Sequence, residues 1–319
     1  MELLKVENLK MYFQTLRGYV RAVDDVSFSV EKGTALGLAG ESGCGKTSSA
    51  LTILRLLPMN ARVLGGKIIF EGTNLLEMSH ERFRQEIRWK KLSVIFQGAM
   101  NALNPVKKIG DQITEGILIH ENINQKEAWE RAKKLLDLVG IGAERIDRYP
   151  HELSGGMKQR TMIAMALACN PDLIIADEPT TALDVIIQAQ VLKVINELRQ
   201  KLHLSMIMIS HDLSMIAETC DFVAIMYAGK IAEYGNVVSV YKEPLHPYTQ
   251  KLIAAFPSIL GPRRELSSIH GFPPDLLNPP PGCRFHPRCS YAMEICRKEE
   301  PPIVQCGGKE HYVACHLVG

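Results

Sequence analysis

The sequence has no apolar run long enough to cross a bilayer, which argues against a chain that spans a membrane. Its first residues, MELLKVENLK, lack the basic start, the long apolar stretch and the cleavage site of a secretory signal, so we expect a cytoplasmic chain. A charge bias is also missing, because 37 basic and 35 acidic residues leave a formal net charge of +2. The sequence therefore gives no electrostatic reason to expect binding to nucleic acid or directly to an anionic membrane.

No internal repeat of fixed period is present either. The 319 residues, 46% hydrophobic and 23% charged, are typical of globular proteins and suffice for one large or two ordinary domains. Cysteine is unevenly distributed, because three of the eight cysteines are scattered and five lie between Cys283 and Cys315. In a reducing compartment this clustering favours a metal site over disulfides.

Hydrophobic periodicity predicts an α/β fold. Alternating apolar residues in the first third, such as Val26, Phe28 and Val30 and the KIIFEG segment at 67–72, predict an antiparallel β subdomain. Three-four spacing predicts a helical subdomain at about 98–160. The apolar segments LIIA, MIMI and FVAIM then alternate with helical segments, which predicts a mainly parallel sheet.

The composition changes after about Pro257 to proline, glycine and cysteine, with three consecutive prolines within residues 278–282. A segment of this kind has few apolar residues for a core and needs another means of stabilisation. We therefore predict a main domain at 1–256 and a small Cys-rich C-terminal extension at 257–319.

Residues 40–47 read GESGCGKT, which matches the phosphate-loop pattern GxxxxGK[ST] between a predicted strand and a predicted helix. The glycines let the backbone curl so that its N–H groups face phosphate oxygens at a helix N-terminus. Lys46 would then neutralise the β and γ phosphates, and the Thr47 hydroxyl would ligate Mg²⁺. A simple glycine-rich turn before a capped helix is the competing interpretation.

Two acids, Asp177 and Glu178, end the apolar strand in DLIIADE, at the edge where an open sheet binds ligands. Asp177 is suited to hold Mg²⁺ through water, and Glu178 to polarise a water that attacks the γ phosphate. Gln97 and His211 follow two other apolar strands, where they would contact Mg²⁺, the attacking water or the γ phosphate. Taken alone, an Asp-Glu pair after a strand is usually a helix cap or a solvated edge, and a lone glutamine is more often a polar surface residue.

The segment LSGGMKQR at 153–160 is not required by phosphate-loop proteins in general. Ser154, Gly155 and Gly156 stand at the head of an apolar helix, where they would form a second phosphate-binding helix N-terminus. A capping turn is the alternative for these three residues taken alone.

In their order and approximate spacing, GESGCGKT, Gln97, LSGGMKQR, LIIADE, TALD and SHD resemble the ATP-binding cassette (ABC) family of P-loop NTPases. The resemblance implies that two cassettes dimerise head to tail and that each ATP lies between one phosphate loop and the partner's signature segment. It also implies that Asp184 of TALD crosses that interface, and that an aromatic residue stacks on adenine. Phe13 is the expected aromatic residue, and Tyr12 and Tyr19 are the alternatives.

The resemblance assigns the catalytic roles to Glu178, His211, Gln97 and Lys46, and the Mg²⁺ contacts to Thr47, Gln97 and Asp177. The ATP contacts that it implies come from Phe13, Gly40, Glu41, Ser42, Gly43, Cys44, Gly45, Lys46, Thr47, Ser48, Ser154, Gly155, Gly156, Gln159 and Asp184.

The segments IFQGAMNALNP, DVIIQAQVL and HPYTQKLIAAFPS and the cysteine-bearing tail are similar to the oligopeptide/dipeptide permease branch of the family. This implies a peripheral ATPase subunit on the cytoplasmic face of the cell membrane. Its partners would be two transmembrane permease subunits, a second ATPase in a heterodimer or homodimer, and, indirectly, an extracytoplasmic binding protein. Oligosaccharide or nickel import, or a soluble ATPase that works outside transport, are the alternatives.

The resemblance also implies that Cys283, Cys289, Cys296 and Cys315 hold a [4Fe-4S] cluster, with Cys306 as the spare. The residues alone leave zinc open as well, because nearby histidines offer alternative ligands and four thiolates do not choose between the metals. Under either interpretation the metal would stabilise a tail that has little core of its own.

Overall fold

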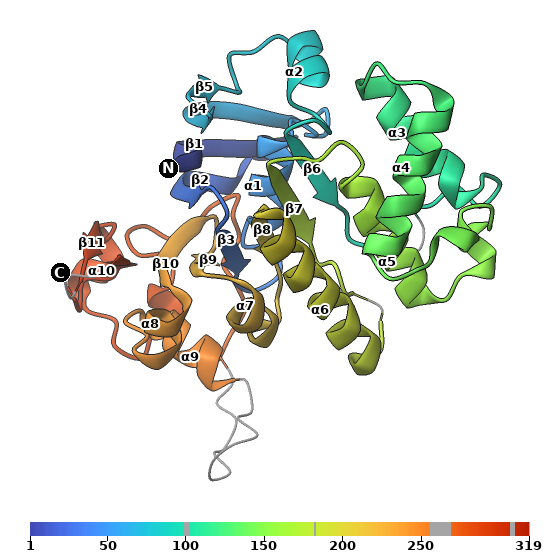
Figure 1. Ribbon diagram of the computed structural model, residues 1–319. Helices are drawn as coiled ribbons and strands as arrows, with labels where there is room; N and C mark the ends of the chain where they lie inside the picture. The colour runs from blue at the N-terminus through green and yellow to red at the C-terminus, as the bar shows by residue number, and fades with distance from the viewer. Residues whose placement is uncertain (99–101, 182, 256–268, 307–309, 319) are drawn as a thin grey trace. The chain divides into compact units, whose positions relative to one another are not determined.

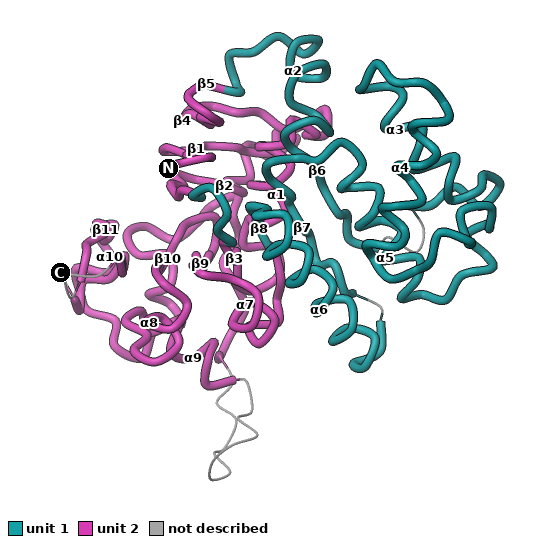
Figure 2. Tube along the Cα trace, viewed as in Figure 1, with its two compact units in different colours: residues 1, 30–35, 75–208 teal, residues 2–29, 36–74, 209–319 magenta. Residues whose placement is uncertain are grey.

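The computed structural model describes residues 1–98, 102–181, 183–255, 269–306 and 310–318. The chain forms two compact units, each assembled from separate stretches of sequence (Figure 2). Unit 1 comprises residues 1, 30–35 and 75–208, and unit 2 comprises residues 2–29, 36–74 and 209–319. Among the described residues, no helix is both long and apolar enough to span a membrane.

Unit 1 contains a parallel sheet segment in the order β8-β7-β6 and a set of helices (Figure 1). Its strands are β6 (Leu92–Ile95), β7 (Leu173–Asp177) and β8 (Ser205–Ile209, the last residue in unit 2). Its helices are α2 (His80–Glu86), α3 (Ile109–His120), α4 (Gln125–Leu138), α5 (Gly155–Ala166) and α6 (Val185–Leu202), with short 3₁₀ turns η2 (Ala143–Arg145) and η3 (Pro150–Glu152). Every residue of β7 is buried, as expected for a parallel strand that is covered on both faces.

Helices α3, α4 and α5 pack against one another in unit 1 (Figure 1). Helix α4 begins with a capping box, in which Asn124 and Glu127 each bond the other's backbone N–H group. Its apolar stripe from Ala128 to Val139 is buried, which confirms the periodicity predicted from the sequence. Gly140, with φ +70°, follows the helix in the left-handed conformation that glycine adopts readily at a helix C-terminus.

Unit 2 contains an antiparallel sheet in the order β2-β1-β4-β5 and a second sheet segment in the order β11-β12-β10-β9-β3. The strands are β1 (Glu2–Thr15), β2 (Gly18–Glu31), β3 (Ala35–Ala39), β4 (Ala61–Phe70), β5 (Thr73–Asn74), β9 (Phe222–Tyr227), β10 (Lys230–Asn236), β11 (Ile303–Gln305) and β12 (His311–Ala314). The helices are α1 (Lys46–Ile53), α7 (Leu213–Thr219), α8 (Val237–Lys242), α9 (Pro247–Ala254) and α10 (Glu294–Lys298), with the 3₁₀ turn η4 (His286–Arg288). Residues 30–35, which include the end of β2 and the first residue of β3, belong to unit 1.

The C-terminal extension adds strands to this second sheet. β12 pairs with β10 in antiparallel register, with Glu233 opposite Val313. The Glu233 carboxylate is fully buried, where it accepts hydrogen bonds from the backbone N–H groups of Leu245 and His246, both at 2.9 Å, and contacts His311 Nε2 at 2.7 Å. The carboxylate thereby connects β10 to the start of α9 and to β12. A buried carboxylate is stable only when it has hydrogen-bond partners of this kind.

The start of α9 depends on a neutral histidine. His246 is 3% exposed, and its Nδ1 accepts a hydrogen bond of 3.0 Å from the backbone N–H group of Tyr248 as the helix cap. Burial lowers the pKa of His246 to about 4 from an ordinary value of 6.5. The imidazole is therefore uncharged in the folded chain at pH values where it is protonated in the unfolded chain.

We expect the free energy of unfolding to rise with pH between about 4 and 6.5, because the unfolded chain binds the His246 proton there and the folded chain does not. The full difference is about 3 kcal/mol and is lost as the pH falls to about 4. Urea unfolding across this range checks it. His246→Asn, which keeps a capping side chain but cannot titrate, should flatten the slope, whereas the exposed-site control His80→Asn should keep it. An unchanged slope in His246→Asn would contradict the prediction.

Candidate nucleotide-binding site

The phosphate loop (residues 40–47) connects β3, which is buried throughout, to α1 in unit 2. Gly40 and Gly45 have φ values of +143° and +108°. A Cβ atom on Gly40 would lie 2.1 Å from the Met226 carbonyl oxygen, and one on Gly45 would lie 2.3 Å from that of Ala22. The loop can follow this path between β9 and β2 only because both positions are glycine.

Lys46 begins α1 and is 7% exposed. Its Nζ donates hydrogen bonds to the carbonyl oxygens of Gly40 at 2.7 Å and Glu41 at 3.1 Å, so the ammonium group lies inside the curl of the loop. Cys44 is buried beside it, and burial raises the pKa of this thiol. The loop therefore holds a buried cation at its centre.

The outer side of the loop is open to solvent. Ser42, Gly43 and Thr47 are exposed, and Ser48 is half-buried. The cap position of α1 is Gly45, which has no side chain to satisfy the first backbone N–H groups of the helix. Exposed N–H groups at a helix N-terminus next to a lysine suit an anion such as phosphate.

In unit 1, β7 ends in the predicted acids. Asp177 is 7% exposed, and Glu178 follows it with φ +46°, which is a strained backbone conformation for a glutamate. Gln97 Nε2 donates to Glu178 Oε2 at 2.7 Å, and the Thr181 hydroxyl donates to the same oxygen at 3.0 Å. The structure thus brings Gln97 and Glu178 together, although 81 positions separate them in the sequence.

Helix α5 begins with the predicted signature residues. Ser154 is the cap, and its hydroxyl accepts from the backbone N–H group of Met157 at 3.4 Å. Gly156 packs closely on α6, because a Cβ atom there would lie 2.5 Å from a methyl group of Ile187. Gln159 is 3% exposed, and its Nε2 has no hydrogen-bond partner among the described residues. The helix begins with the small residues Ser154, Gly155 and Gly156, which suit the close approach of an anion to its N-terminus.

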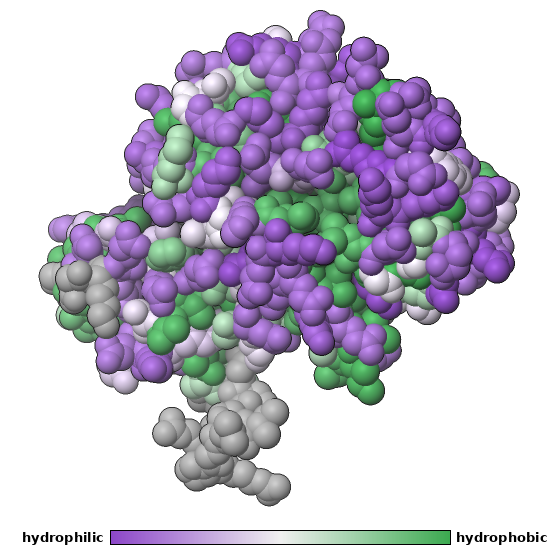
Figure 3. Space-filling model, viewed as in Figure 1, coloured by the Kyte–Doolittle hydropathy of each residue, from purple (hydrophilic) through white to green (hydrophobic). Residues whose placement is uncertain are grey.

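Asp184 is exposed and caps α6 by accepting a 3.0 Å hydrogen bond from the backbone N–H group of Ile187. Val185 and Ile186, the first two residues of the helix, are 80% and 71% exposed. They contribute to the apolar surface at the lower end of α6 (Figure 3).

The remaining predicted residues lie in unit 2. His211 is exposed between β8 and α7. Phe13 is half-buried on β1, opposite Ala61 of β4. Among the alternatives for adenine stacking, Tyr19 is 44% exposed, whereas the Tyr12 hydroxyl donates to Asp24 at 2.6 Å. Burial and this hydrogen bond raise the pKa of Tyr12 to about 12.

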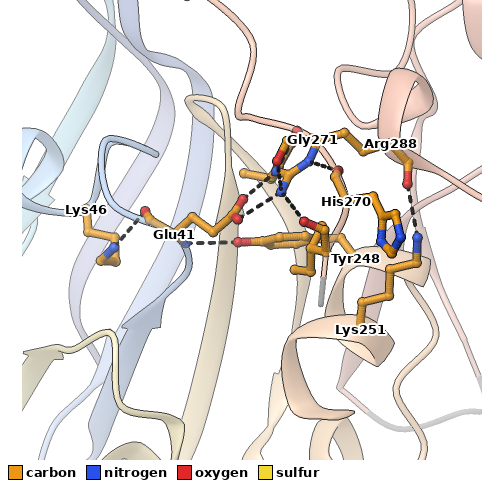
Figure 4. Close-up of polar contacts among 9 residues, drawn as sticks. Glu41, Lys46, Tyr248, Lys251, His270, Gly271 and Arg288 are labelled. Atoms are coloured by element: carbon orange, nitrogen blue, oxygen red, sulfur yellow. Dashed lines mark hydrogen bonds and ion pairs between the residues drawn. The ribbon is translucent and has the colours of Figure 1, made fainter. Parts of the chain in front are cut away.

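Sequence reasoning missed two residues that contact the phosphate loop. Tyr248 and Arg288 both bond to Glu41, from positions 207 and 247 residues away (Figure 4). No local spacing pattern links residues so far apart. The only available signal was the segment HPYTQKL around Tyr248, which pointed to a family branch and not to this contact.

Two family models match the chain. Residues 23–181 match the model described as ABC transporter, and residues 232–296 match the one described as oligopeptide/dipeptide transporter, C-terminal region. The first match contains the phosphate loop, the signature helix and the acidic end of β7. The second contains Tyr248, Arg288 and three of the tail cysteines.

Curated relatives match nearly the whole chain. A probable peptide ABC transporter ATP-binding protein of Sinorhizobium fredii is 46% identical over 98% of this chain and 94% of its own length. The oligopeptide transport ATP-binding protein of Bacillus subtilis is 47% identical over 99% of this chain and 89% of its own length. The dipeptide transport ATP-binding protein of the same organism is 46% identical over 94% of this chain and 90% of its own length.

Solved structures agree on the fold. A dimeric ATP-binding cassette in a post-hydrolysis state, bound to ADP and phosphate, has a TM-score of 0.65 at 22% identity and covers 73% of this chain and 98% of its own. A subunit of an ABC transporter complex from Clostridium perfringens has a TM-score of 0.65 at 25% identity and covers 76% of this chain and 91% of its own. Fold and site therefore define an ATP-hydrolysing P-loop NTPase of the cassette class. The chain belongs to the family of ABC transporter ATP-binding proteins for oligopeptides and dipeptides.

Proposed function

We propose that this chain is the ATPase subunit of an importer for oligopeptides or dipeptides. The observation that carries the proposal is the contact between Gln97 and Glu178 at the end of β7, where two neighbouring strands supply a carboxylate and an amide. Water attack on a γ phosphate needs an oriented acceptor of this kind. The names of the curated relatives support peptide import as the work that hydrolysis drives.

The roles of the individual residues follow from their chemistry. Glu178 orients and polarises the attacking water, and Gln97 and the Thr181 hydroxyl keep its carboxylate in one orientation. Lys46 offsets the charge on the β and γ phosphates, while the loop N–H groups bind their oxygens. His211 contacts the γ phosphate.

The oxygen donors on these elements fit a magnesium ion, which prefers carboxylate, hydroxyl and amide oxygens. Asp177, the Thr47 hydroxyl and the Gln97 carbonyl oxygen would hold it. Gln97 uses its amide N–H group on Glu178, which leaves the carbonyl oxygen as its metal-binding atom. When bound, the ion neutralises charge that develops on the phosphates.

A second cassette completes the site in this proposal. Ser154, Gly155, Gly156 and Gln159 would act on the partner's ATP, and the partner's signature helix on the ATP bound here. The exposed Val185 and Ile186 beside Asp184 support a protein contact at this end of α6. The partner is a related ATPase in a heterodimer or a second copy of this chain.

Two transmembrane permease subunits would receive the motion of the cassettes, with an extracytoplasmic binding protein delivering the peptide. The chain then acts peripherally, on the cytoplasmic face of the membrane. The match to a transporter-specific C-terminal region supports this placement, because a soluble cassette ATPase has no need of it.

Glu178→Gln should lower the rate of ATP hydrolysis at least about 100-fold and leave the affinity for ATP close to wild type. The amide keeps the shape of the side chain but cannot polarise water. Phosphate release and equilibrium nucleotide binding by the purified chain check the two parts. Glu197→Gln, which removes an exposed carboxylate on α6, is the matched control and should hydrolyse ATP normally. Unchanged turnover in Glu178→Gln would refute its role.

We propose that residues 1–256 form the ATPase domain, with a helical subdomain at about 98–160, and that the C-terminal extension (residues 257–319) carries a [4Fe-4S] cluster. Burial raises the pKa of Cys283 to about 11, and the thiols of Cys296, Cys315 and Cys289 act in the same direction. The backbone N–H group of Cys283 also donates to the Cys296 carbonyl oxygen at 2.8 Å.

Four thiolates suit either a [4Fe-4S] cluster or a single zinc ion, and the proposal of a cluster rests on the resemblance of the tail to its family branch. Among the residues that the structure describes, no three His, Cys, Asp or Glu side chains are arranged to hold one metal ion. The cluster would supply a cross-link for the extension.

The chain purified without oxygen should contain about four irons per molecule and absorb visible light. Cys289→Ser should lose most of the iron, whereas Cys306→Ser, the predicted spare, should retain it. Metal analysis with visible spectra measures both. Zinc without iron in the wild-type chain would overturn the cluster and favour the zinc alternative.

A further inference from the structure

A buried arginine next to the tail cysteines contacts the phosphate loop. Arg288 stands immediately before Cys289, and its side chain is 5% exposed. Its guanidinium group forms two parallel bonds with the Glu41 carboxylate, NH1 to Oε2 at 2.6 Å and NH2 to Oε1 at 3.0 Å (Figure 4). This fork geometry makes it a strong and directional ion pair.

The guanidinium group is itself held from several sides. Its Nε donates to the His270 carbonyl oxygen at 3.0 Å, and NH2 also donates to that of Gly271 at 3.2 Å (Figure 4). NH1 also donates to the Tyr227 hydroxyl at 3.3 Å. The hydrogen bond that Arg288 donates to the Glu41 carboxylate raises the pKa of Arg288 above its ordinary value. The arginine is therefore a fixed anchor and not a mobile surface cation.

A second residue, Tyr248, holds the backbone of Glu41. The N–H group of Glu41 donates to the Tyr248 hydroxyl at 2.9 Å, and Tyr248 is fully buried. Its ring packs at 4.7 Å from that of Tyr227 and 5.4 Å from that of Phe285 of the extension. Both the side chain and the amide of Glu41 are thus fixed by residues outside the loop.

The contact between Arg288 and Glu41 is one hydrogen bond away from the catalytic Lys46. The Glu41 carbonyl oxygen accepts a 3.1 Å hydrogen bond from Lys46 Nζ. A displacement of Glu41 would therefore move an acceptor of Lys46 and change the curl of the phosphate loop. The residues that fix Glu41 consequently also control where the ammonium group lies.

A second buried arginine forms a parallel connection. Arg284 follows Cys283, pairs with Asp24 of β2 and bonds to the Ala228 carbonyl oxygen. The next residue, Gly229, donates its N–H group to the Cys44 carbonyl oxygen in the loop at 2.9 Å. The two arginines between Cys283 and Cys289 thus both connect to the phosphate loop.

We propose that Arg288 is a positioning residue for nucleotide binding, through which the cysteine-bearing segment 283–289 holds the phosphate loop in its phosphate-binding shape. The proposal rests on the proposed function of residues 40–47 as the phosphate site. Removing the guanidinium group leaves the Glu41 carboxylate without its fork partner, and the loop then has to be ordered by ATP itself. Such a loss weakens binding and leaves the hydrolysis step, which depends on Glu178 and Gln97, nearly unchanged.

The test measures MgATP binding by the full-length purified chain, together with the KM and kcat of hydrolysis, iron content and circular dichroism. The variants are Arg288→Met, Glu41→Ala, the double variant and Arg288→Lys. Lys251→Met is the matched control, because Lys251 donates to the Arg288 carbonyl oxygen at 3.1 Å and not to Glu41. Lys46→Ala tests the phosphate site separately.

We expect Arg288→Met to weaken MgATP binding about tenfold, with kcat within about twofold of wild type, and Glu41→Ala to weaken MgATP binding by a similar factor. The double variant should be no weaker than either single variant, because both remove the same contact. Arg288→Lys should recover part of the affinity, and Lys251→Met should bind as wild type does.

Wild-type affinity in Arg288→Met, or effects that multiply in the double variant, would overturn the proposal. Should Arg288→Met fail to fold, Arg288→Lys decides, because it keeps the charge but loses the two parallel bonds to Glu41 and should still bind MgATP more weakly than wild type. Wild-type affinity in Lys46→Ala would instead refute the phosphate site itself, so the two failures are distinguishable.

Discussion

A phosphate loop has to keep several backbone N–H groups in one curled conformation. In this chain, contacts that hold Glu41 in place meet this constraint. Tyr248 holds its amide, Arg288 holds its carboxylate, and its carbonyl oxygen accepts from Lys46. The curl leaves no room for side chains at Gly40, where β9 passes too closely. A preformed site of this kind loses less entropy when ATP binds.

The same contacts give the C-terminal extension a role beyond its own folding. Arg284 and Arg288 of the extension are buried in ion pairs. A buried ion pair stabilises the fold only when each charge keeps its partner. Phe285 is 2% exposed because it packs on aromatic rings of β9 and α9. β12 adds to the sheet beside β10, where buried Glu233 joins three segments. Arg288 of the extension thus contacts the phosphate loop directly.

Local patterns allowed much of the fold and site to be predicted from the sequence. The stripe on α4 follows the helical period, and the acids at 177–178 follow an apolar strand, so both could be located without tertiary information. The partners of Glu41 and Glu233 could not, because they depend on strand register and on residues far apart in the chain. The strained φ of Glu178 likewise has no sequence signature.

Hydrogen exchange at the backbone amides of the phosphate loop, with and without MgATP, tests the account most directly. The Glu41 amide should exchange slowly even without nucleotide, because Tyr248 already accepts its hydrogen bond. The amides of residues 43–47 should become protected when MgATP is added. A loop whose exchange does not respond to MgATP would contradict this account.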